Sequence, residues 1–111
     1  MASVTLKNII PTKNVEDSLT VQYTSPAKCL IDKFTATNIT SSAVDFYVYL
    51  TASGGTTTTT NLIINRYSIG PYETYTCPEI VGHVIEAGGF ISTLAGSALS
   101  ISIRASGREI T

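Results

Sequence analysis

The stretch Val44-Asp45-Phe46-Tyr47-Val48-Tyr49-Leu50 decides the fold class, because all of its even positions are apolar. Successive side chains of a β-strand point to opposite faces, so the apolar set faces a core while Asp45, Tyr47 and Tyr49 project to the other side. A strict period of two is typical of a strand with one buried face. The stretch therefore predicts a β-strand that carries two outward tyrosines.

Similar runs recur along the chain at short, regular spacing, with turn residues between them. The predicted strands are 4–10, 19–23, 29–37, 44–50, 62–69, 72–77, 90–94 and 99–103, the last continuing toward 105–110. We expect Pro11 and Pro26 to end the first two strands, because proline cannot donate to a central ladder. Residues 53–60 contain two glycines followed by five threonines, which predicts a long mobile loop.

Composition favours the same class of fold. The 111 residues include 17 Thr, 13 Ile and 7 Val, and β-branched side chains fit a pleated, half-buried surface better than a helix. About eight strands in a chain of this size predict one all-β domain spanning 1–111. We expect a single-domain antiparallel two-sheet jelly roll or a related Greek-key sandwich, with an up-and-down barrel as the second choice.

Charge gives little reason to expect a polyanionic partner. Only 14% of the residues are charged and the formal net charge is −1, so no strong field attracts nucleic acid or an anionic membrane. The uncharged stretches 46–65 and 87–103 are interrupted by polar residues and glycine, so neither is expected to span a bilayer. The start Met1-Ala2-Ser3-Val4 lacks the features of a signal peptide, which predicts a protein made and kept in the cytosol.

Residues that could carry chemistry are few and dispersed. Cys29 and Cys77 lack C-x-x-C spacing, and cytosolic redox conditions favour two free, semi-buried thiols, with a late disulfide or a mere spatial pair as the alternatives. The single histidine, His83, has no adjacent orienting acid or nucleophile, which favours a structural or surface role. The sequence also lacks a nucleophile elbow, a calcium loop and a phosphate-binding loop. We therefore predict no enzyme, no cofactor and no metal site.

The aromatic residues are skewed toward tyrosine, with six Tyr, three Phe and no Trp. Aromatic side chains that carry a polar group, such as the tyrosine hydroxyl, are enriched where a protein surface is buried against another protein. Tyr47 and Tyr49 are the strongest candidates, because the inner face of their strand is already complete without them. The sequence thus indicates a protein whose function depends on its surface.

Five stretches resemble segments of small virion proteins encoded by tailed bacteriophages, in matching order and spacing. They are 23–27, 37–44, 49–56, 81–91 and 103–111. In length and character the chain is similar to the capsid decoration, or staple, proteins of epsilon15-like podoviruses. The resemblance implies a jelly roll, made in the host bacterial cytoplasm, that binds the outside of the head in many copies and clamps neighbouring major capsid protein subunits. Similar modules also occur in phage fibres and tails, so a module that binds host-surface glycans is the alternative function.

If the protein clamps capsid subunits, several surface patches are the expected contact sites. They are the N-terminal segment, with 1–5 as a contact arm, the outward tyrosines, the glycine-threonine loop and the basic C-terminal end. Their residues are Ala2, Val4, Leu6, Tyr47, Tyr49, Gly54, Gly55, Thr56, Thr58, Arg104 and Arg108. The expected partners are the major capsid protein and, for a homodimer, a second copy of this chain. A small enzyme whose site needs a partner chain is a further alternative.

Overall fold

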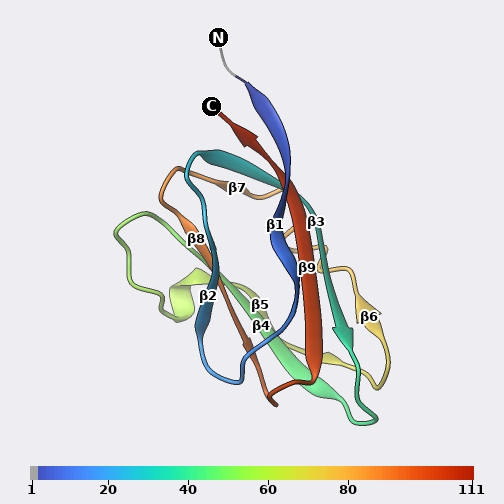
Figure 1. Ribbon diagram of the computed structural model, residues 1–111. Helices are drawn as coiled ribbons and strands as arrows, with labels where there is room; N and C mark the ends of the chain where they lie inside the picture. Colours follow the sequence, from blue (N-terminus) through green and yellow to red (C-terminus); the bar gives the residue numbers. More distant parts are fainter. Residues whose placement is uncertain (1–2) are drawn as a thin grey trace.

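The computed structural model describes residues 3–111, which form two antiparallel β-sheets packed face to face (Figure 1). Within these residues the strands are β1 (Val4–Asn14), β2 (Thr20–Thr24), β3 (Lys28–Asn38), β4 (Val44–Thr51), β5 (Leu62–Ile69), β6 (Thr74–Tyr75), β7 (Val84–Ile85), β8 (Phe90–Ala95) and β9 (Ile101–Ile110). One 3₁₀ turn, η1 (Thr59–Asn61), precedes β5. Over the range 3–111, no helix is long and apolar enough to cross a membrane.

The strand order is that of a jelly roll. One sheet has the order β1-β9-β3-β6, with β7 also paired to β3, and the other has the order β2-β8-β4-β5. When β6 and β7 are taken as one interrupted strand beside β3, this is the pairing of an eight-stranded jelly roll. The two-sheet prediction is confirmed. The barrel alternative is wrong, because β1 pairs with β9 and β2 with β8 rather than each with its neighbour in sequence.

The interrupted strand differs from the predicted run 72–77, which is reduced to the two residues of β6. Cys77 and Gly82 have positive φ angles of 50° and 90°, and Pro78 between them has no N–H to give to a ladder. The intervening segment stays attached to β3, because Gly82 N donates to Ile31 O at 2.7 Å and Ile31 N donates to His83 O at 3.0 Å. The chain then pairs with β3 again at β7.

Pro11 does not end the first strand, contrary to our expectation. β1 continues through Pro11 to Asn14 and, within residues 3–111, pairs only with β9, so it forms the margin of its sheet. A proline on an edge strand removes no inter-strand bond when its nitrogen faces away from the neighbouring strand. Register shifts between Lys7 and Ile10 and between Ile10 and Lys13 also interrupt the ladder here, as β-bulges commonly do at edges.

The core lies between the two sheets and has the predicted alternation. Val44, Phe46 and Val48 of β4 are buried, and Leu50 packs against the core while partly exposed. The rings of Phe34 on β3 and Phe46 lie 6.4 Å apart, so the two sheets meet through aromatic side chains. This inner face leaves Tyr47 and Tyr49 on the outside, as the sequence predicts.

Candidate interaction surfaces

The predicted contact residues divide between the outer faces of the two sheets. Val4, Leu6, Arg104 and Arg108 belong to β1 and β9, whereas Tyr47 and Tyr49 belong to β4 in the other sheet. Ala2 lies outside the described residues. Because the two outer faces of a sandwich point in opposite directions, the predicted patches form two surfaces instead of one.

The first surface, which we call the terminal face, covers the end of the sheet where β1 begins and β9 ends (Figure 1). Its residues are Val4, Leu6, Leu30, Val84, Arg108 and Ile110. Leu6 is directly opposite Arg108, Arg108 is opposite Leu30, and Leu30 is opposite Val84. Directly opposed residues of an antiparallel pair point to the same side of the sheet. Four strands therefore contribute one continuous row of side chains.

Several apolar side chains of the terminal face are strongly exposed. Leu6 is 79% exposed, Val4 60% and Val84 51%. Single exposed apolar residues are ordinary in soluble proteins, whereas a large contiguous apolar patch is typical of an interaction site. Here Arg108 lies between Leu6 and Leu30, so the terminal face is a candidate for such a site. The sequence alone did not identify Leu30, Val84 or Ile110 as part of the surface, because only the register of β3 with β7 and β9 places them beside Leu6 and Arg108.

The charge on the terminal face is locally neutralised. Arg108 forms a two-point ion pair with Asp32, Nε to Oδ2 at 3.0 Å and Nη2 to Oδ1 at 2.9 Å. This contact raises the pKa of the Arg108 guanidinium above its usual value. The other basic residue of the strand, Arg104, makes a separate contact, with Nη1 3.3 Å from Thr12 Oγ1. The two arginines thus have different partners and do not act as one basic cluster.

A cluster on the inner side of the sheet fixes the terminal face in position. Glu109, only 8% exposed, accepts a hydrogen bond from the Tyr23 hydroxyl of the opposite sheet and lies 3.1 Å from Lys7 Nζ of β1. The Tyr23 hydroxyl, together with Lys7, lowers the pKa of Glu109 although burial opposes that shift. Burial, and then the Glu109 carboxylate, raise the pKa of Tyr23. The cluster joins β1, β2 and β9, and sequence analysis did not predict it.

The second surface, which we call the tyrosine face, lies on the outside of the other sheet. Its residues are Val21, Tyr47, Tyr49, Leu62 and Leu94. Tyr49 is opposite Leu62 on one side and Ser92 on the other, and Tyr47 is opposite Leu94. None of the five residues is charged, and an ion pair between Asp45 and Arg66, at 3.2 Å, lies toward one end.

The glycine-threonine loop adjoins the tyrosine face and is more ordered than its composition predicts. Thr51 Oγ1 and Thr57 Oγ1 lie 2.7 Å apart, and Gly55 N donates to Ala52 O at 2.9 Å. Thr58 caps η1 through a capping box with Asn61. Gly55 fits tightly here, because a Cβ atom would lie 3.1 Å from both Ala52 O and Thr51 Cγ2 and would require a small shift of these neighbours. Gly54, with φ of 76°, makes the adjacent bend, and Thr56 is exposed between these anchors.

The residues with reactive side chains do not meet in a chemical site. Cys29 and Cys77 are free and buried, and burial raises the pKa of Cys77 to about 12, which keeps its thiol protonated. The side chain of His83 is exposed. Within residues 3–111, no group of three or more His, Cys, Asp or Glu residues is placed to hold a metal ion.

The geometry defines a jelly-roll sandwich with two separate outer surfaces. No family model and no curated protein matches the sequence. Among solved structures, a chain in the structure of the infectious bursal disease virus Gx strain is similar, with a TM-score of 0.55 and 9% sequence identity over 99% of this chain and 33% of that chain. A chain in the structure of the Gt strain gives a TM-score of 0.49 and 10% identity, over 98% and 33% of the two chains. The protein spans about a third of the length of these chains, and the likeness to the first shows a shared fold.

Proposed function

We propose that the protein is a structural component of a virus particle: a capsid decoration protein that binds the outside of a phage head and clamps neighbouring major capsid protein subunits. The observation that carries the proposal is the presence of exposed apolar side chains on both outer faces of one thin sandwich, Leu6 and Val84 on one face and Val21 on the other. The molecule measures 49 by 27 by 19 Å, so its two faces are close enough to contact two shell subunits at once.

The physical mechanism is linkage between binding and assembly. A rigid body that binds two subunits stabilises only the arrangement that presents both sites, because binding to one state shifts the equilibrium toward that state. After the first face has bound, the second contact is intramolecular and gains from a high effective concentration. The clamp therefore needs no catalytic group.

The dimensions of the molecule leave room for such contacts. A standard interface buries about 800 Å² on each partner, and the two longer axes of the whole molecule measure 49 and 27 Å. Tyrosine and arginine are enriched in such contacts. The tyrosine face carries the half-buried Tyr47 and Tyr49, and the terminal face carries Arg108 among exposed aliphatic residues.

Two similarities support a place in a virion. The fold is shared with a chain of the infectious bursal disease virus structure, and the sequence resembles small virion proteins of tailed phages. The outer surface of the head is the location that the decoration role requires. A homodimer is compatible with the clamp, because pairing through one face of each copy leaves the second face of both copies free.

The proposal is tested by mixing the purified protein with undecorated heads of the virus that encodes it. We expect the protein to co-sediment with the heads in hundreds of copies per particle, measured by gel densitometry against the major capsid protein. A fibre or tail module that binds glycans would instead be present in few copies and would not bind bare heads. Absence of co-sedimentation at concentrations well above the subunit concentration would refute the clamp.

A further inference from the structure

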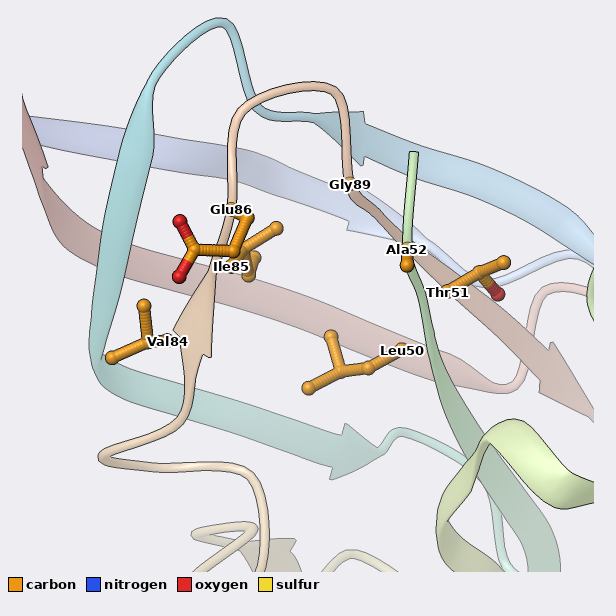
Figure 2. Close-up of a pocket in the computed structure, with 7 residues that line it drawn as sticks. All are labelled: Leu50, Thr51, Ala52, Val84, Ile85, Glu86 and Gly89. Atoms are coloured by element: carbon orange, nitrogen blue, oxygen red, sulfur yellow. The ribbon is translucent and has the colours of Figure 1, made fainter. Parts of the chain in front are cut away.

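A cavity of about 160 Å³ opens where the terminal face meets the end of β4. Figure 2 shows the aliphatic side chains of Leu50, Val84 and Ile85 around it, with Glu86 on the adjoining turn. Val84 belongs to both the terminal face and the cavity wall, so the exposed apolar row leads directly to this opening.

Two glycines in the turn beside the cavity leave no room for a side chain without local rearrangement. Gly88 has φ of 84°, and a Cβ atom there would collide with the side chain of Ser53. At Gly89 a Cβ atom would lie 2.8 Å from Ile85 Cγ2 and 3.0 Å from Glu86 O. The turn is also tied to the chain before β3, because Gly88 N donates to Ser25 O at 2.7 Å and Ser25 N donates to Gly89 O at 2.8 Å.

The size and lining of the cavity fit one apolar side chain. An apolar cavity of about 150 Å³ accepts a group as large as benzene, which is comparable to the side chain of leucine. Backbone pairing is also available nearby. In the described chain β7 pairs with β3 alone, and β5 reaches β4 only as far as Tyr49, so Leu50 and Thr51 have no strand on that side.

The rim of the cavity carries one negative charge. The Glu86 side chain is 71% exposed, and its only ion pair in the structure of residues 3–111 is a long one, 3.9 Å to Lys28 Nζ. A partner that places a cation beside the cavity would gain a closer contact with this carboxylate.

We propose that this cavity is a socket for a single leucine-like side chain on an extended segment of a capsid subunit, with a lysine or arginine beside that residue facing Glu86. The inference rests on the proposed function for the identity of the partner. The chemistry of the socket itself, an apolar anchor with an adjacent cation, follows from the cavity and its rim.

The socket is tested first without any capsid. Amide shifts of the ¹⁵N-labelled protein are followed during titration with acetyl-Lys-Leu-Lys-amide and, separately, with acetyl-Lys-Gly-Lys-amide, at millimolar concentrations. We expect saturable shifts at residues 50–52 and 84–89 with the leucine peptide, which should bind at least about tenfold more tightly than the glycine peptide. Equal responses to the two peptides, or shifts confined to other residues, would overturn the proposal.

Variants test the location. Ala52→Phe places a ring in the cavity and should abolish the shifts, whereas Ala98→Phe, the same change at an exposed alanine in the turn between β8 and β9, should leave them intact. Glu86→Gln should weaken binding of the leucine peptide by about threefold, a change typical of an exposed ion pair. Unchanged peptide binding in Ala52→Phe would overturn the socket.

Binding to undecorated heads separates this inference from the proposed function. Ala52→Phe should lower occupancy at limiting protein concentration, and Ala98→Phe should not. If the wild-type protein binds heads but the leucine peptide gives no shifts in the cavity, the socket is wrong and the clamp stands. If the peptide occupies the cavity and no variant or wild-type protein binds heads, the clamp is wrong and the socket stands.

Discussion

At the residue scale, the position of Glu109 in a β-strand does not by itself reveal that its side chain connects neighbouring strands. Its position in the sequence indicates only a polar residue near the C-terminus. In the fold it is almost fully buried between the Tyr23 hydroxyl and the Lys7 ammonium. These contacts join β1, β2 and β9 on the inner side of the sheet, behind the terminal face.

The lowered pKa of Glu109 makes the stability dependent on pH. The ionised carboxylate is the form that is stabilised in the fold, so its contribution is present above the ordinary value of 4.5 and is lost as pH falls through the lowered folded value. We expect the wild-type protein to have a higher Tm than Glu109→Gln at neutral pH, with the difference shrinking below about pH 4.5. Thermal unfolding of both proteins across this range measures the effect, and a difference that is independent of pH would contradict it.

Asn38 is a second residue whose role depends on the fold. Its side chain is fully buried; Nδ2 donates to Ser42 O at 2.7 Å and to Ile69 O at 3.0 Å, and Oδ1 accepts from Thr40 N at 2.9 Å. The amide thus holds the turn between β3 and β4 against the end of β5.

Asn38→Ala should lower the free energy of unfolding by about 3 kcal/mol, because it leaves buried backbone groups without partners. Urea unfolding measures the change. Asn61→Ala provides the comparison, since it removes a capping contact to Thr58 N that is worth about 1 kcal/mol or less. Equal losses in the two variants would show that Asn38 does not hold the turn as the geometry indicates.

At the scale of elements, β4 presents its tyrosines on the face that the core does not use. Tyr47→Ala combined with Tyr49→Ala should lower the affinity for heads by about thirtyfold or more, since paired interface aromatics contribute at least about 2 kcal/mol. Circular dichroism should show an unchanged fold, because Val44, Phe46 and Val48 still fill the core. Tyr72→Ala, at a tyrosine that is 71% exposed in a turn, is the control. Unchanged occupancy on heads would remove the tyrosine face from the interface.

The N-terminal part of β1 offers the corresponding test of the terminal face. Leu6→Asp should lower the affinity for heads by about tenfold or more, because burying a leucine contributes about 1.5 to 3 kcal/mol. Leu99→Asp is the matched control, since Leu99 is 70% exposed in the turn before β9 and belongs to neither face. Co-sedimentation at limiting protein concentration compares the two variants, and equal loss in both would indicate a nonspecific effect of the added charge.

At the scale of the whole molecule, the clamp requires both faces on one rigid body. A variant with one damaged face should still bind heads when it is supplied in excess, yet it should no longer raise the temperature at which the heads release their DNA. Under the proposed function the wild-type protein should raise it, because a molecule with both faces intact would connect two subunits. Release is followed with a DNA-binding dye during heating. Full protection by Leu6→Asp at saturating occupancy would show that stabilisation needs only one face.

The alternation of apolar and polar residues in the sequence was sufficient to predict the all-β fold class and to identify some of the residues on the outer surface. The alternation of residues 44–50 determined that Phe46 and Val48 face a core and that Tyr47 and Tyr49 do not, because side-chain direction in a strand depends only on the period of two. The same rule could not place Pro11, since tolerance of proline depends on whether a strand has a neighbour on that side.

Tertiary structure decided which side chains are neighbours. Leu6, Arg108, Leu30 and Val84 are far apart in sequence and form one row only through the register of four strands. The partners of Glu109, the burial of Asn38 and the cavity beside Val84 depend equally on contacts between segments that no local pattern relates. The alternation within each strand thus determined which residues point away from the core. The pairing of strands decided which of these residues lie side by side on one face, because register is set by packing over the whole sandwich.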